Sequence, residues 1–269
     1  MITRRIPETP TITGLPAFAD NYIWLLDDGQ AAVAVDPGDG EVVAEALRGR
    51  GLELRAILVT HHHRDHTGGI AALKARTNAT VYAPTAEAGR IPGVDRVLHD
   101  GDRIALPLEG ALTLEVLAVP GHTAGHIAYF APTAGWLFCG DTLFSAGCGR
   151  IFEGTAAQMH ASLQRLAALP DATKVYCAHE YTLANLRFAA AVEPENAAVS
   201  DALVATTARR NEGKPTVPST VGHEKSINPF LRCDEPALAG AVRCHDGGCG
   251  AAEVEVFAAL RRWKDSFRG

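Results

Sequence analysis

The sequence predicts an α/β protein that ends in a small helical domain. Two observations support this prediction. Short apolar runs alternate with turns and amphipathic segments over roughly the first two thirds of the 269 residues, and the strand pattern then stops near residue 180. This length fits one larger and one smaller domain. We therefore expect an α/β sandwich at residues 1–180 and a helical domain at 181–269.

The first predicted elements form a hairpin. The apolar runs at 22–26 and 31–35 are separated by Asp-Asp-Gly-Gln, which is a turn signal. A helix at 41–50 and a continuous apolar strand at 56–59 follow, the latter typical of a strand buried on both faces. Further strands are predicted at 80–83, 112–119, 126–130, 136–139 and 174–177, and helices at 69–78, 156–169, 183–192, 197–212 and 251–267. The Pro-, Gly- and Ser-rich stretch before the last helix is predicted to be a loop.

The composition limits the function classes. The net charge of −6 gives no overall basic field that could hold nucleic acid. No apolar run approaches the roughly 20 residues of a membrane span, and no secretory signal follows the first methionine. The six cysteines are scattered in a long chain, which indicates reduced thiols. The cytoplasm is the expected location.

The motif T-H-H-H-R-D-H-T-G-G is the sharpest chemical signal. It follows a buried strand and precedes a helix, so it occupies the kind of loop where α/β sheets build their sites. In an extended loop His61 and His63 share one side, while His62 points away. Asp65 and His66 follow where the chain turns into the helix. The motif can therefore offer two imidazoles to one metal ion and a carboxylate with an imidazole to a second ion.

Three further candidates follow predicted strands. His122 occurs in V-P-G-H-T-A-G-H, Asp141 in F-C-G-D-T and His179 in V-Y-C-A-H-E. Small residues before each allow the backbone to turn and the side chain to reach inward. His126 is interpreted as a packing or outer partner. The predicted ligands are His61, His63 and His122 for one ion and Asp65, His66 and His179 for the other, with Asp141 as the bridge.

This ligand set indicates metal-dependent hydrolysis. Two adjacent cations lower the pKa of a bridging water and polarise a carbonyl oxygen. Nitrogen and oxygen ligands suit two divalent ions, zinc first, with iron or manganese as alternatives. No G-x-S-x-G or P-loop motif offers another mechanism. Attack by a hydroxide that bridges the two ions is therefore expected, with Asp65 and Asp141 as catalytic residues.

The four motifs are similar to those of the metallo-β-lactamase superfamily, which implies a four-layer αββα sandwich with the metals at one edge of two packed sheets. Further stretches resemble the glyoxalase II (hydroxyacylglutathione hydrolase) family and together span nearly the whole chain. They are P-A-F-A-D-N-Y-I-W, F-C-G-D-T-L-F-S-A-G-C-G-R-I-F-E-G-T, C-A-H-E-Y-T-L-A-N-L, N-P-F-L-R and R-R-W-K-D-S-F.

This resemblance implies hydrolysis of S-D-lactoylglutathione to D-lactate and glutathione, the second step of methylglyoxal detoxification, by a monomer. Mapped by motif, the glutathione contacts are Arg150, Tyr181, Arg261 and Lys264. Arginine and lysine pair well with the carboxylates of glutathione, although basic residues at the end of the last helix also suit its dipole. Phe152 stands where some family members carry tyrosine. The segment Cys233–Gly250 matches no known pattern.

Three alternatives remain open at this stage. A glutathione persulfide dioxygenase of the same superfamily would use a single iron, which the complete second ligand set argues against. A nuclease or lactonase is a second option, and the acidic net charge weakens the nuclease. A metal-stabilised binding module without activity is the third.

Overall fold

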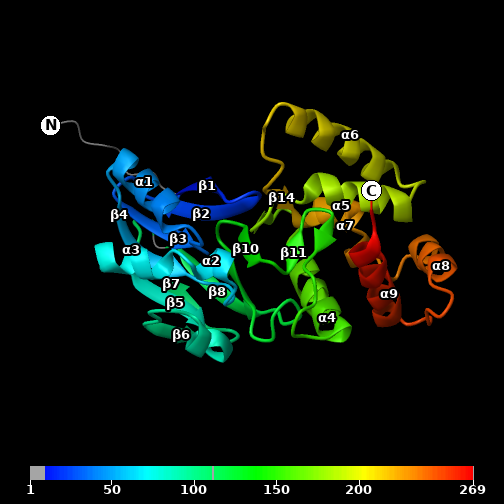
Figure 1. Ribbon diagram of the computed structural model, residues 1–269, viewed down its shortest axis with the longest axis horizontal. Helices are drawn as coiled ribbons and strands as arrows, with labels where there is room; N and C mark the ends of the chain where they lie inside the picture. The colour runs from blue at the N-terminus through cyan, green and yellow to red at the C-terminus, as the bar shows by residue number, and fades with distance from the viewer. Residues whose placement is uncertain (1–9, 111, 269) are drawn as a thin grey trace. The chain divides into compact units, whose positions relative to one another are not determined.

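The computed structural model describes residues 10–110 and 112–268. The chain forms two compact units (Figure 1). Unit 1 comprises Met1–Ala118 and Gly125–Gly140, and unit 2 comprises Val119–Ala124 and Asp141–Gly269. The predicted domain boundary at residue 180 falls inside unit 2 and stays a prediction. Within the described ranges, no helix is long and apolar enough to cross a membrane.

The first sheet of unit 1 has six strands in chain order. They are β1 (Thr11–Ala17), β2 (Asn21–Asp27), β3 (Ala31–Val35), β4 (Glu53–Leu58), β5 (Thr80–Pro84) and β6 (Arg96–Leu98). The pairs β1–β2 and β2–β3 are antiparallel, and those from β3 to β6 are parallel. In the turn between β2 and β3, Asp28 Oδ1 accepts the backbone N–H groups of Gln30 and Ala31. The predicted hairpin is confirmed.

Helices cover one face of this sheet (Figure 1). The helices of unit 1 are α1 (Gly40–Arg50), α2 (Arg64–Thr67), α3 (Ile70–Arg76) and the 3₁₀-helix η1 (Thr85–Arg90). Val43 and Leu47 of α1 pack with Leu73 of α3 in one buried cluster with sheet residues. The helix α1 begins where Asp39 caps two backbone N–H groups, and it ends at Gly51, whose φ of 65° suits glycine.

A second group of strands covers the other face. In the order β10-β9-β8-β7, these are β10 (Trp136–Gly140), β9 (Ile127–Ala131), β8 (Thr113–Ala118) and β7 (Arg103–Ala105). The Tyr129 hydroxyl donates to the carbonyl of Val59, 2.8 Å away, and Ile127 N donates to Thr60 O at 3.0 Å. Every residue of β2, β9 and β10 is buried, which explains their continuous apolar sequences. The predicted α/β sandwich is confirmed.

Unit 2 is mainly helical after its first strands. Its elements are β11 (Leu143–Phe144), β12 (Gly147–Cys148), α4 (Ala156–Ala167), β13 (Lys174–Cys177), α5 (Thr182–Val192), α6 (Ala197–Asn211), β14 (Ser219–Thr220), α7 (Val221–Ile227), η2 (Pro229–Leu231), α8 (Pro236–His245) and α9 (Glu253–Ser266). Leu186, Val199 and Ile227 bring α5, α6 and α7 into one buried cluster. The rings of Phe230 and Phe257 meet edge to face at 5.7 Å.

The loop predicted before the last helix is wrong over much of its length. It contains α7, α8 and the short strand β14. Thr220 caps α7 by accepting the His223 N–H, and Pro236 stands in the first turn of α8. Both are helix-start signals. The Pro, Gly and Ser content of this segment is a weaker guide to its structure than the position of each of these residues.

Candidate metal centre

The histidine motif of unit 1 lies directly after β4. His61 is fully buried, and its Nε2 lies 3.1 Å from Nδ1 of His63. His62 turns away, as predicted, because Glu87 Oε2 accepts both its backbone N–H and its Nδ1, each at 2.7 Å. Glu87 itself is buried on η1 and also accepts the Gly125 N–H at 2.9 Å. Two imidazoles are thus presented together while the residue between them anchors the loop.

Asp36, at the end of β3, supports this motif from behind and was not among the predicted site residues. Its Oδ1 accepts the Thr60 N–H at 2.8 Å, and its Oδ2 accepts the Thr60 hydroxyl at 2.7 Å. Oδ2 also lies 3.1 Å from His66 Nδ1, and the Thr60 oxygen lies 3.0 Å from His61 Nδ1. Since the Thr60 hydroxyl donates to Asp36, it accepts from His61. Both histidines therefore carry their proton on Nδ1 and keep Nε2 for another partner.

Asp65 is fixed by two neighbours. Its Oδ2 accepts from Asn21 Nδ2 at 3.0 Å and lies 3.4 Å from His66 Nε2. The loop after Asp36 presses on it so closely that a Cβ on Gly38 would lie 1.7 Å from the Asp65 carbonyl oxygen. Only glycine fits there. Asn21 was also missed as a site residue, although it follows Asp20 in one of the motifs that carry the family resemblance.

His126 has the packing role that the sequence suggested. It is fully buried in unit 1, and its ring stacks on that of His61 with centroids 4.6 Å apart and an interplanar angle of 21°. Because the ring of His61 is held between this stack and the hydrogen bond to Thr60, it has one orientation.

Unit 2 gathers the other three predicted ligands. His122 Nε2 lies 3.4 Å from Asp141 Oδ2, and His179 Nε2 lies 3.3 Å from Asp141 Oδ1. Each oxygen of the carboxylate thus faces a different imidazole, as a bridging role requires. His122 Nδ1 donates to the carbonyl of Arg150 at 2.8 Å, which fixes its tautomer. All three side chains are buried.

Two of the predicted glutathione contacts lie beside this group. The Tyr181 ring stacks on His179 at 4.7 Å and 5°. The Arg150 side chain is exposed. Phe152, at 61% exposure, meets the edge of the His122 ring at 5.3 Å. An aromatic surface without a hydroxyl therefore borders His122.

The other two predicted contacts lie on α9 and differ in burial. Arg261 is buried, and its Nη1 donates to the Cys148 carbonyl at 3.0 Å while Nη2 pairs with Asp265 at 2.9 Å. Lys264 is half-buried and donates to the Ala184 carbonyl at 3.0 Å. Burial, and then the nearby Arg261 charge, lower the pKa of Lys264 to about 8. Lys264 is therefore mostly charged at neutral pH.

The unmatched segment Cys233–Gly250 packs on this helix. The His245 ring stacks on Trp263 at 3.8 Å and 9°, and Asp246 pairs with Arg262. Cys233 is buried, and burial raises the pKa of its thiol. Cys244 and Cys249 hold no metal geometry with His245 in the described residues, where all six cysteines are free. Cys244 and His245 lie in the last turn of α8, so this segment is partly helical.

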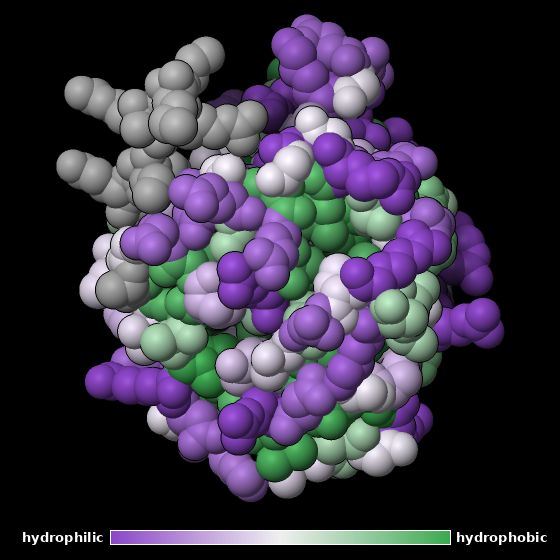
Figure 2. All heavy atoms as spheres, turned by 90° about the vertical axis from the view of Figure 1, so that its left-hand side faces the viewer, coloured by the Kyte–Doolittle hydropathy of each residue, from purple (hydrophilic) through white to green (hydrophobic). Residues whose placement is uncertain are grey.

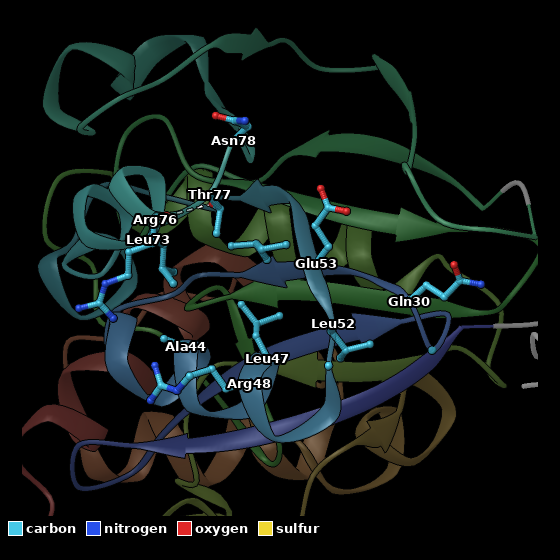
Figure 3. A pocket seen from close by; sticks show the side chains of 13 residues that line it. Gln30, Ala44, Leu47, Arg48, Leu52, Glu53, Leu73, Arg76, Thr77 and Asn78 are labelled. Carbon is cyan, nitrogen blue, oxygen red and sulfur yellow. Dashed lines mark hydrogen bonds between the residues drawn. The ribbon is translucent and has the colours of Figure 1, made fainter. Parts of the chain in front are cut away.

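Unit 1 also contains a cavity of about 1220 Å³. It is lined by Leu47, Leu52 and Leu73 together with polar residues that include Gln30 and Glu53 (Figure 3). Figure 2, which views the side of Figure 1 that carries α1 and α3, shows hydrophobic and hydrophilic side chains interleaved there. None of the seven predicted ligands lines this cavity.

Comparison with known proteins decides the family. Residues 18–179 match the metallo-beta-lactamase superfamily, and residues 180–267 match the family described as hydroxyacylglutathione hydrolase C-terminus. The hydroxyacylglutathione hydrolase of Albidiferax ferrireducens is 55% identical over 256 residues, which cover 94% of this chain and 98% of the relative. That of Chromohalobacter salexigens is 54% identical over 260 residues, or 96% and 99% of the two chains. The chain belongs to the hydroxyacylglutathione hydrolase family.

Solved structures agree with the fold of this family. ETHE1 from Myxococcus xanthus superposes with a TM-score of 0.63 at 26% identity, covering 94% of this chain and 98% of that one. TTHA1623 in a di-iron-bound form gives a TM-score of 0.58 at 26% identity, covering 82% and 100%. The metallo-β-lactamase-like sandwich with C-terminal helices is therefore confirmed.

The donor set of this hydroxyacylglutathione hydrolase family member fits divalent metal ions. Ligands at 2.0–2.1 Å on a tetrahedral ion lie about 3.3 Å from one another. The facing nitrogens of His61 and His63 are 3.1 Å apart. The Asp141 oxygens lie 3.3 and 3.4 Å from the imidazole nitrogens that face them. Two imidazole nitrogens that face each other, and a buried carboxylate between two more, are the donors that zinc or iron takes.

Proposed function

We propose that the chain hydrolyses S-D-lactoylglutathione, an S-2-hydroxyacylglutathione, to D-lactate and glutathione, the second step of methylglyoxal detoxification. The observation that carries this proposal is the identity above 50% with hydroxyacylglutathione hydrolases over nearly the full length of both chains. The match to residues 180–267 supports the glutathione thioester more than other substrates of the superfamily, because that region is described by the same activity. A persulfide dioxygenase is correspondingly less supported.

Two divalent metal ions are the proposed cofactors, with zinc first and iron or manganese as alternatives. His61, His63 and His122 would hold one ion, Asp65, His66 and His179 the other, and Asp141 would bridge. In support, the hydrogen bonds to Nδ1 of His61, His66 and His122 leave Nε2 of each ring for a metal. When bound, such a pair of ions lowers the pKa of water to near neutrality and polarises the thioester carbonyl.

The protein's own acids would direct the attacking water. Asp65 is the proposed proton acceptor, because Asn21 holds its Oδ2 and so orients the carboxylate. Asp141 is buried with one imidazole facing each of its carboxylate oxygens, which supports its proposed place between the two ions. The leaving group needs no general acid, since a cysteine-like thiol has a pKa near 8.5 and departs as thiolate.

Four side chains are the proposed glutathione contacts: Arg150, Tyr181, Arg261 and Lys264. Lys264 and Arg150 suit the glutathione carboxylates by charge. Arg261 contributes its Nε, a buried donor without a hydrogen-bond partner among the described residues. A bound carboxylate would satisfy it. Tyr181 would contribute its hydroxyl from its stack on His179.

The proposed setting is a monomer in the cytoplasm. The six cysteines, all of them free thiols in the structure, fit a reducing compartment. Size-exclusion chromatography with light scattering would test the monomer, and a dimer mass would contradict it.

The test of the function is thioester hydrolysis by purified protein, followed through free-thiol release, with metal content measured on the same sample. We expect rapid turnover of S-D-lactoylglutathione with about two metal ions per chain. A fully metallated sample without turnover would exclude this substrate. Oxygen uptake with glutathione persulfide would then be measured, and a positive result there would favour the dioxygenase.

A further inference from the structure

The hairpin β11–β12 closely follows the predicted ligand Asp141 in the chain. It begins two residues after Asp141 and ends two residues before Arg150. Both of its strands have two residues, and its tip holds Ala146 at a φ of 56°, a left-handed conformation that alanine rarely adopts. So short a hairpin has little stability of its own. Contacts from outside it must hold this geometry.

Side chains from four later helical segments bind its backbone. Asn228 Nδ2 donates to the carbonyls of Phe144 at 3.1 Å and Gly147 at 2.9 Å. Asn185 Nδ2 on α5 donates to Ser145 O at 3.0 Å, and Glu224 Oε2 on α7 accepts the Ala146 N–H at 2.7 Å. The fourth is Arg261 of α9, which donates to Cys148 O. Each residue from 144 to 148 thus has a backbone group bound by a side chain from the helices.

These supporting groups form one buried network. Glu224 and Asn228 are both fully buried, and Asn228 Nδ2 lies 3.1 Å from Glu224 Oε2. The other carboxylate oxygen of Glu224 accepts the Ser219 hydroxyl. Burying a carboxylate and an amide is costly unless each is fully hydrogen-bonded. Apolar side chains would fill the same space without this desolvation penalty. The buried polar network therefore indicates that one hairpin conformation is required.

The hairpin in turn sets two predicted metal ligands. Gly149 N donates to Thr142 O at 3.2 Å, and a Cβ on Gly149 would lie 1.9 Å from the Asp141 carbonyl oxygen. The strand therefore returns directly against Asp141. The next residue, Arg150, provides the carbonyl that accepts from His122 Nδ1. A shift of the hairpin would displace both Asp141 and the group that fixes the His122 tautomer.

We propose that Asn185, Glu224 and Asn228 are positioning residues that hold Asp141 and His122 in metal-binding geometry through the hairpin β11–β12. The helical region thus supports the metal centre in addition to its substrate contacts. This inference rests on the proposed function in one respect, namely that Asp141 and His122 are metal ligands.

The decisive variant is Asn228→Ala, with Asn196→Ala as its matched control. Both asparagines cap a helix through Oδ1 and donate Nδ2 to a backbone carbonyl, but Asn196 donates to Ser226 outside the hairpin. Metal affinity is measured by chelator competition with zinc, and steady-state kinetics are measured on the metallated protein. For Asn228→Ala we expect affinity lower by about 10- to 100-fold, as for outer partners of metal ligands, and kcat reduced with KM unchanged. For Asn196→Ala we expect wild-type affinity and a melting temperature lower by about 2–4 °C.

Two further variants keep the test decisive if Asn228→Ala does not fold. Asn185→Ala removes the single bond to Ser145 and is expected to lower zinc affinity in the same direction by a smaller factor. Glu224→Gln retains an oxygen for the Ala146 N–H and is expected to recover most of the affinity that Glu224→Ala loses. Wild-type zinc affinity in folded Asn228→Ala or Asn185→Ala, or a change confined to KM, would overturn the proposal. Because chelator competition needs no substrate, absence of thioesterase activity in the wild type would refute the function alone.

Discussion

The two groups of predicted ligands are held in different ways. In unit 1, Asp36 and Glu87 act on His66 and His62 from 30 and 25 residues away, and both are carboxylates at the edge of the same sheet. In unit 2, side chains 40 to 113 residues further on, including the charged groups of Glu224 and Arg261, bind backbone groups of the hairpin that follows Asp141. Charged partners raise the basicity of an imidazole more than a neutral carbonyl does. The first group therefore depends on carboxylates that contact its imidazoles, and the second on distant side chains that bind the backbone of a neighbouring hairpin.

Asp141→Asn should have the largest effect, because it changes the carboxylate that His122 and His179 both face. Asparagine keeps the size but offers one oxygen and no charge, so one of the two imidazoles loses its facing oxygen. We expect kcat/KM for S-D-lactoylglutathione to fall by more than about 100-fold, beyond the range of outer-partner substitutions. Metal analysis should show fewer than two ions per chain. Full metal content with near-normal turnover would rule out the bridging role.

Asp36→Asn tests whether charge supports the unit 1 group. Asparagine tolerates the φ of 52° at this position, so the backbone is preserved while the carboxylate is lost. We expect zinc affinity to fall by about 10- to 100-fold in chelator competition. Asp28→Asn is the matched control, because Asp28 is buried and accepts three backbone N–H groups far from the ligands. An equal loss of zinc affinity in both variants would mean that fold stability, and not local charge, is responsible.

Glu87→Gln tests the second carboxylate that supports the histidine motif of unit 1. The carboxylate accepts from His62 on one oxygen and from Gly125 on the other, so an amide must turn its NH₂ toward one of these donors. We expect zinc affinity about tenfold lower, with KM unchanged. Glu41→Gln, an exposed partner of Arg76, should leave both quantities at wild-type values. An increase in KM alone would place Glu87 in substrate binding instead.

Lys264 gives the smallest expected effect and carries a pH signature. Its pKa of about 8 means that the ammonium is charged below that pH and loses its charge as the pH rises through it. If Lys264 pairs with a glutathione carboxylate, KM rises between pH 7 and 9, and Lys264→Met raises KM about fivefold or less at pH 7 and removes the pH dependence. Arg262→Met, a neighbour paired with Asp246, is the control. A wild-type KM that is constant up to pH 9 would argue against the contact.

Most of the fold could be predicted because its strands are long and apolar. Runs such as 31–35 and 136–139 are buried on both faces, and their continuous apolar sequences predict such strands directly. The strand β1 was missed because its residues are mostly half-exposed and include Gly14 and Pro16, which weaken the pattern. Strands of two residues, such as β12, are too short to have a period at all.

The candidate ligands could be named from the sequence because metal chemistry demands particular residues at strand ends. Their supporting residues could not, for two reasons. Asp36 belongs to D-P-G-D-G, which is typical of a turn, and only its place at the end of a strand beside β4 signals a further role. Glu224 and Asn228 act on backbone groups some 80 residues away, and such pairings leave no spacing in the sequence. The assignment of all seven ligands to two ions stays a proposal.

The large sequence separation between the hairpin β11–β12 and the helices that bind it has a consequence during protein synthesis. Arg261 follows Cys148 by 113 residues, which take about 6 to 23 s to add at about 5–20 residues per second. The His61–His66 motif, by contrast, has its partners Asp36 and Glu87 within 30 residues. A nascent chain should therefore order its first histidine cluster well before Asp141 is fixed. Limited proteolysis of chains arrested after residue 200 is expected to cut near residue 146, and chains extended past residue 261 should resist.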